Sequence, residues 1–174
     1  MFNSQQIISH YGGSSMVRLI GSGILILTSM SMAMLSEGEK QGYENAISEQ
    51  NGYLTQNGNE VVVMIPVEEL YQDKTTYLAE GADGITTILE SLIKRSSGRV
   101  YLRGLLNEAQ PNYVFATSAL YAQVSNLSEY LLKSVSGVSY SPVTVEGYQK
   151  NNNYKIWERF PNSETFVSLS LVVD

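Results

Sequence analysis

Three stretches in the middle of the chain decide the fold: EVVVMIPVEELYQDKTTYLAEGADGITTILESLIK at residues 60–94, GRVYLRGLLN at 98–107 and LSEYLLKSVSG at 127–137. The first opens with an uninterrupted apolar run, Val61 to Ile65, which is typical of a strand covered on both faces. Apolar residues then follow helical spacing from Ile85 to Ile93, and again over 114–133. Between these two predicted helices, residues 100–104 alternate as a strand does.

Weaker signals outside these stretches complete the predicted order of elements. Asn57-Gly58 separates two short apolar runs and predicts a tight hairpin turn, because both residue types tolerate positive φ. Residues 143–147 predict a short strand, and 166–173 alternate as a last strand with Ser168 and Ser170 on the face away from the helices. The predicted order is ββαβαββ. It corresponds to an α+β sandwich with two helices on one face of a small mixed sheet.

Composition excludes several classes of function. The 174 residues fit one domain plus a tail, and 17 acidic against 11 basic residues give a net charge of −6 without a basic stripe, so nucleic acid is not an expected partner. The absence of cysteine excludes disulfides and thiolate chemistry. His10 is the only histidine and lies near the N-terminus, which excludes a His-based triad in the folded part. We therefore expect no cofactor, no metal and no enzymatic activity.

The N-terminal segment predicts export or anchoring. Residues 19–35 carry no charge, Arg18 precedes them, and acidic residues follow. This pattern fits a secretory signal with cleavage after Ala33, with Met16 as the true start. An uncleaved membrane anchor and a buried core helix are the alternatives that this length leaves open. The predicted division is 1–36 as tail plus signal or anchor, 37–51 as a short helix or linker, and 52–174 as the folded domain.

Over about residues 52–174 the chain resembles the OmpA/MotB-like cell-wall-binding domain. The pair Leu70-Tyr71 resembles the family's stretch between first strand and first helix, and GLLN at 104–107 falls where the family has Gly-His-Thr-Asp. VEGY at 145–148 resembles the strand that ends in Gly-Tyr-Gly, and NSE at 162–164 stands near the family's Asn-Arg-Arg. The resemblance implies an OmpA-like sandwich in the bacterial cell envelope.

The resemblance also implies a ligand site that has lost its charges. In the family, a loop Asp and a helix Arg hold the charged ends of diaminopimelate in peptidoglycan. Asn107 and Gln123 stand at these positions here, and Leu105, Leu106 and Ala116 replace the family's other polar residues. Neutral hydrogen bonds are about half as strong as charge-assisted ones, so we expect peptidoglycan binding to be weak or absent. Asn107 has a second interpretation as a residue that only caps the turn after the strand.

Aromatic residues are the remaining feature. The chain has 12 tyrosines. Tyrosine and tryptophan are enriched at interfaces, although core packing explains any single one as well. Those that predict a protein-binding face are Tyr101, Tyr113, Tyr121, Tyr130, Tyr148, Tyr154, Trp157 and Phe160.

Together these features predict a non-enzymatic structural or docking component of a bacterial envelope complex. It would be periplasmic and membrane-associated through its N-terminal segment. A secretion system, of the type IVB kind among others, is the expected host, and other proteins of the complex are the expected partners. The alternative is a peptidoglycan-binding cell-wall anchor.

Overall fold

The computed structural model describes residues 34–73, 75–148 and 156–173, all of which belong to one compact unit spanning 32–174. His10 and the predicted signal or anchor segment up to residue 33 lie outside the described residues, as do Tyr154 and the side chain of Trp157. Leu35, the last residue of that segment, is described and is 4% exposed in the apolar core. Among the helices that the structure describes, none has the length and apolar character needed to cross a membrane.

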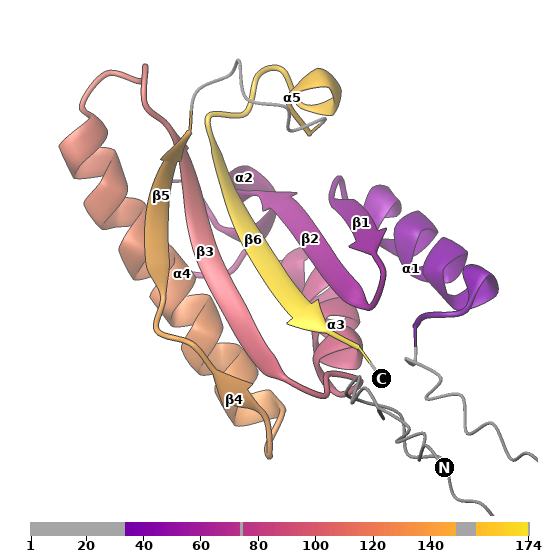
Figure 1. Ribbon diagram of the computed structural model, residues 1–174. Coiled ribbons are helices and arrows are strands. Elements are labelled where there is room, and N and C mark those ends of the chain that lie inside the picture. The colour runs from indigo at the N-terminus through magenta and orange to yellow at the C-terminus, as the bar shows by residue number, and fades with distance from the viewer. Residues whose placement is uncertain (1–33, 74, 149–155, 174) are drawn as a thin grey trace, which may run out of the picture. The chain divides into compact units, whose positions relative to one another are not determined.

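Helices on one face of a mixed sheet make up this unit (Figure 1). The helices are α1 (Glu37–Glu49), α2 (Val67–Leu70), α3 (Ala82–Ile93), α4 (Tyr113–Ser134) and α5 (Ile156–Arg159). The strands are β1 (Tyr53–Asn57), β2 (Glu60–Pro66), β3 (Arg99–Asn107), β4 (Ser139–Tyr140), β5 (Thr144–Tyr148) and β6 (Thr165–Val172). The strand order is β1-β2-β6-β3-β4, and β5 also pairs with β3. Only β4 and β5 run parallel to β3, so the sheet is mixed as the sequence predicted.

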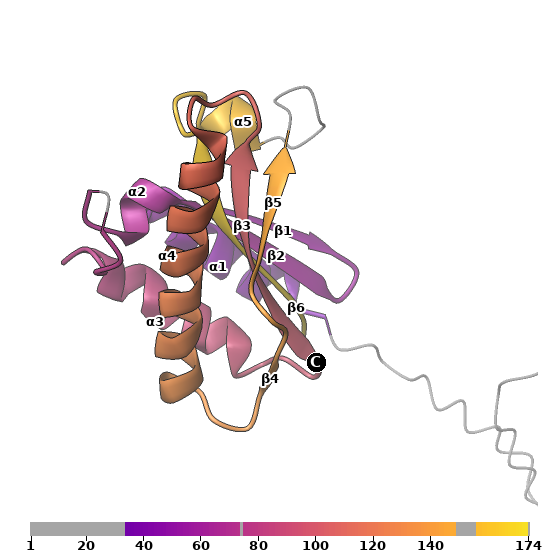
Figure 2. The ribbon, with the colours of Figure 1, turned by 90° about the vertical axis from the view of Figure 1, so that its left-hand side faces the viewer.

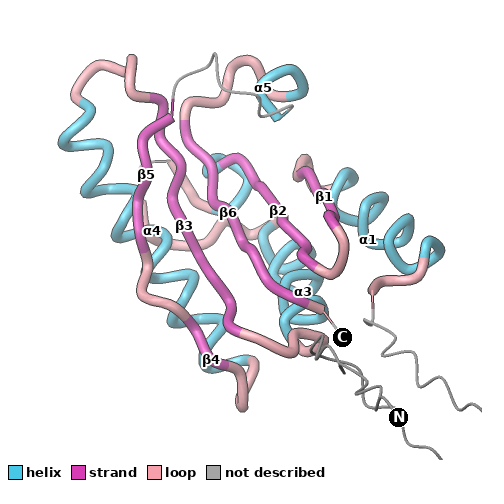
Figure 3. The backbone as a smooth tube through the Cα atoms, in the orientation of Figure 1, coloured by secondary structure: helices cyan, strands magenta, loops and turns pink. Residues whose placement is uncertain are grey.

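Helices α3 and α4 cover one face of this sheet, which a view turned by 90° and the backbone tube both show (Figures 2 and 3). The predicted apolar stripes form this interface, because Leu89, Leu92, Leu120, Leu127 and Leu131 are each at most 1% exposed. Ile88, predicted with them, is only partly buried. The facing strand residues are branched and equally buried: Val61, Val63, Ile65, Val100, Leu102, Val167, Leu169 and Leu171.

The hairpin between β1 and β2 forms as predicted, but its turn is displaced by one residue. Asn57 pairs with Glu60 across the two strands, so Gly58 and Asn59 make the turn instead of Asn57 and Gly58. Only Gly58 adopts positive φ there, at 62°. Glycine carries no Cβ penalty in this conformation, which explains why the turn places Gly58 at its first position.

Residues 37–51, for which the sequence left helix and linker open, contain α1. Ser36 and Glu39 form a capping box at its start, with mutual hydrogen bonds between side chain and backbone. Arg95 just beyond α3 contacts the Glu39 carboxylate at 2.5 Å. Ile47, at 0% exposure, inserts into the core that α3 also covers. The helix is thus packed onto the domain.

The two serines of β6 lie on the sheet face away from the helices, as the alternation predicted, but that face is not open to solvent there. Ser168 and Ser170 are only 4% and 7% exposed. β6 lies in the centre of the sheet, so each serine has longer neighbours on both flanking strands; Ser168 stands between Met64 and Arg103. Next to them on the same face, a second apolar cluster forms from Met64, Leu105, Tyr148 and Phe166.

Candidate functional site

The end of β3 packs unusually close to α4. A Cβ added at Gly104 would lie 2.6 Å from Cγ of Leu120, so only glycine lets this strand and helix approach as they do. The two residues that follow, Leu105 and Leu106, are 7% and 0% exposed and belong to the two apolar clusters on opposite faces of the sheet. They therefore stabilise the fold, and neither lines a pocket around the site.

Asn107 ends β3, and both the nitrogen and the oxygen of its side-chain amide form hydrogen bonds. Its Nδ2 donates a hydrogen bond to the Glu164 carboxylate, and its Oδ1 accepts one from the backbone N–H of Ala109 at 3.1 Å. The second bond closes the local turn in the way the turn-capping interpretation requires. At 6% exposure, Asn107 holds two loops together: the one after β3 and the one before β6.

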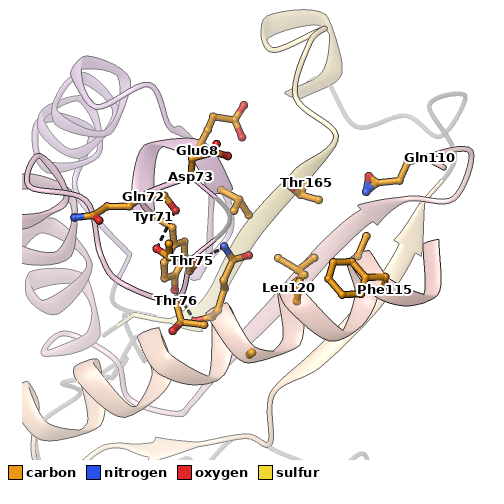
Figure 4. A pocket seen from close by; sticks show the side chains of 15 residues that line it. Glu68, Tyr71, Gln72, Asp73, Thr75, Thr76, Gln110, Phe115, Leu120 and Thr165 are labelled. Carbon is orange, nitrogen blue, oxygen red and sulfur yellow. Dashed lines mark hydrogen bonds between the residues drawn. The ribbon is translucent and has the colours of Figure 1, made fainter. Parts of the chain in front are cut away.

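Gln123 on α4 is engaged in the same way. Its Nε2 donates to the backbone carbonyl of Thr75 at 2.8 Å, and it is 8% exposed. The backbone carbonyl of Gln123 accepts a hydrogen bond of 2.5 Å from the hydroxyl of Tyr71. Burial raises the pKa of this Tyr71 hydroxyl well above its ordinary value of 10.0. These two bonds tie the connection between α2 and α3 to the middle of α4 (Figure 4).

A groove of about 790 Å³ opens between that connection and the first half of α4. We call it the α4 groove; Figure 4 shows the 15 side chains that line it. Gln123 lies in this groove, whereas Asn107 lines a neighbouring hollow of about 520 Å³ with Glu164 and Pro111. Gln110 lines both. The structure thus brings the two predicted residues into adjacent pockets rather than into one.

The lining of the α4 groove combines an apolar wall with hydrogen-bond acceptors. Phe115, Ala119 and Leu120 of α4 form much of the wall, and Phe115 is 78% exposed. Glu68 of α2 and Asp73 supply two carboxylates on the opposite side. No Lys, Arg or His is among the described lining residues; Lys74, which follows Asp73 in sequence, lies outside the described part. The described residues also contain no cluster of side chains that would hold a metal ion.

Sequence reasoning missed Glu68, Asp73 and Phe115. Helical spacing could have found Phe115, because it falls one residue before Ala116 and therefore off the buried stripe of α4. Nothing in the sequence marks Glu68 or Asp73 apart from the connection in which they stand. The predicted aromatic face does not form a single surface: Tyr148 is buried, Tyr121 lies on α4, and Tyr101 lies on the sheet face away from that helix.

No family model and no curated protein matches the sequence, but solved structures match the fold. The cell wall anchor of the type VI secretion system from Pseudomonas aeruginosa superposes with a TM-score of 0.57 at 13% identity, covering 80% of this chain and all of that one. A MotB-like protein from Desulfovibrio vulgaris gives 0.55 at 15% identity over 77% and 91%. The chain therefore has the OmpA/MotB-like fold that the sequence predicted.

Proposed function

We propose that this chain is a non-enzymatic structural component of a bacterial envelope complex, in which its OmpA/MotB-like domain docks other proteins. The fold supports this, since the two similar structures are a secretion-system cell wall anchor and a MotB-like protein. A fold alone does not define a function, so the chemistry of the candidate site has to support the role.

The observation that carries the proposal is that both residues at the positions implied by the resemblance, Asn107 and Gln123, are neutral and internally bonded. Asn107 bonds to Glu164 and to the backbone of Ala109, and Gln123 bonds to the backbone of Thr75. A carboxylate and a guanidinium that pointed into the site would each form charge-assisted bonds to a zwitterionic ligand. Here each amide already stabilises a loop, so only the donors and lone pairs left over could contact a ligand, and these are neutral.

The location that we propose is the periplasm, reached through residues 1–36 as a signal or membrane anchor. A secretion system is the proposed host, with the type IVB kind as one form of it. Other proteins of that complex are the proposed partners. The second candidate is a working peptidoglycan anchor. It is favoured by the similarity to a cell wall anchor across the whole length of that protein.

Sedimentation with purified sacculi separates the two candidates. The full chain in detergent should stay in the supernatant at physiological salt, where a peptidoglycan-binding OmpA-like domain pellets. Asn107→Ala should then leave its distribution unchanged. If the wild-type chain pellets and Asn107→Ala releases it, the anchor function replaces the docking function.

The proposed loss of a ligand site is testable by restoring the two charges. Asn107→Asp alone would set a carboxylate against that of Glu164, and two adjacent carboxylates repel each other. We therefore expect Asn107→Asp with Gln123→Arg to gain sacculus binding only when Glu164→Gln is added. The matched control is Glu164→Gln alone, which should not pellet. A triple variant that folds but still fails to pellet would show that the backbone of the site, and not only its charges, has changed.

A further inference from the structure

We infer that the α4 groove binds a protein segment that presents a lysine or arginine next to an apolar side chain. This inference rests on the proposed docking function and adds the chemistry of the partner. It begins from the size of the groove, about 790 Å³, which is within the range of pockets that enclose a large side chain or a small ligand.

The groove offers hydrogen-bond acceptors that a donor from a partner could bind. Glu68 and Asp73 are exposed carboxylates on one side, and no ion pair joins either of them to another described residue. The Glu68 carboxylate accepts one hydrogen bond, from the Ser163 hydroxyl. On the other side, the Oε1 atom of Gln110 is buried and has no hydrogen-bond partner. A buried acceptor without a donor costs free energy until a ligand or water supplies one.

The wall of the groove offers an apolar surface that an aliphatic side-chain stem could cover. Phe115 is 78% exposed although it is aromatic, and the exposed Ala119 of the same helix also lines the groove. A bare cation would leave this surface in water. Lysine and arginine carry their charge on an aliphatic stem, and either head group also binds favourably over an aromatic ring. One such side chain therefore matches both the wall and the carboxylates.

A protein segment fits this arrangement better than a free amine does. Binding hot spots combine a buried anchor with a surrounding polar rim, and a segment covering Phe115 would meet the carboxylates on the other side of the groove. The net charge of −6 adds a general attraction for a basic partner. The carboxylates then select the charged head, and Phe115 selects the apolar neighbour.

A random peptide library displayed on phage and selected on the full chain tests the inference. Enriched peptides should share a Lys or Arg adjacent to a large apolar residue. One enriched peptide is then synthesised and titrated calorimetrically. Its affinity should fall about tenfold or more with Glu68→Gln plus Asp73→Asn, and similarly with Phe115→Ala. Changing the peptide's basic residue to Gln should have the same effect.

The matched control is Glu60→Gln plus Glu129→Gln, which removes the same charge from exposed positions outside the groove. Its affinity should change less than about twofold, a change of under 0.5 kcal/mol. Enriched peptides without a basic residue, no enrichment at all, or equal losses in both double variants would overturn the inference. Circular dichroism confirms that each variant is folded. Because sacculus sedimentation is measured separately, the docking function can fail or stand independently of this result.

Discussion

The two faces of the sheet are buried to different extents and are built in different ways. The face under α3 and α4 is made of aliphatic residues from every long strand and from both helices, and its members are nearly all at most 2% exposed. The opposite face has a small apolar cluster, in which Met64, Leu105 and Tyr148 pack around Phe166. Two buried serines of β6 lie beside this cluster. One face is covered by helices, whereas the other, in the part of the chain that the structure describes, carries only its own side chains and the loop residue Phe160.

This difference separates the packed scaffold from the loops that carry the candidate site. The helix-covered face holds the scaffold, and its packing fixes α4 against β3 at Gly104. The open face anchors the loops that bear Asn107 and Glu164, through the Tyr148 hydroxyl, which donates to the Glu164 carbonyl at 3.1 Å. Burial, followed by the carboxylates of Glu164 and Glu68, raises the pKa of Tyr148.

Matched Leu→Ala changes on the two faces should give the largest effect. Leu127→Ala under the helices should lower the free energy of unfolding by roughly 2–5 kcal/mol, since the side chain is fully buried in a rigid core. Leu105→Ala on the open face should cost near 2 kcal/mol, the low end of that range, because loops can relax around it. Chemical denaturation measures both. Equal losses would remove the distinction between the faces.

Gly104→Ala tests the close approach of β3 and α4. The added methyl group would stand 2.6 Å from Cγ of Leu120, so we expect a loss of about 1–3 kcal/mol through overpacking. In a Leu120→Ala background the same change should cost clearly less, because the clashing side chain is absent. If the two losses simply add, the clash with Leu120 is not the cause of the cost. The added methyl group would then be hindered by Val145, whose Cγ2 lies 3.1 Å from it.

Much of the scaffold could be predicted because it depends on periodicity. The helical stripes around Leu89 and Leu127, and the apolar run of β2, identify buried surfaces without knowledge of their partners. The alternation placed Ser168 and Ser170 on the correct face, but it could not predict their burial, which depends on the strands that flank β6. For the same reason local turn signals placed the hairpin correctly but its turn one residue too early.

The site was harder to predict because it is assembled from loops. The resemblance predicted Asn107 and Gln123 as site positions, and each of them lines a pocket in the structure. It could not show that their amides bond to Glu164 and to the Thr75 backbone, because these partners lie 57 and 48 residues away. The wall and the carboxylates of the α4 groove likewise depend on how α2 meets α4.

Gln123→Ala should have a smaller effect than the core changes. It removes the donor to the Thr75 carbonyl, which should cost roughly 1–2 kcal/mol if that carbonyl stays unsatisfied. Hydrogen exchange should accelerate around Thr75 and Tyr77 more than in the sheet. Gln72→Ala is the control, since its exposed side chain lines the same groove without any such bond, and it should stay within about 0.5 kcal/mol. Equal exchange in both variants would show that Gln123 does not hold the connection.

The smallest expected effect concerns the stability of α1, which packs beside the edge strand β1. The Ser36 hydroxyl, followed by the Arg95 guanidinium, lowers the pKa of Glu39 from 4.5 to about 2. Because the pKa is lowered in the folded state, the stabilisation is complete above pH 4.5 and is lost as the pH falls toward 2. Glu39→Gln should remove this part of the pH dependence while other carboxyl groups continue to titrate. Hydrogen exchange of α1 amides, measured in both proteins across this window, should therefore differ above pH 4.5 and converge near pH 2. A difference that persists at the acidic end would mean that Glu39 acts through packing and not through its charge.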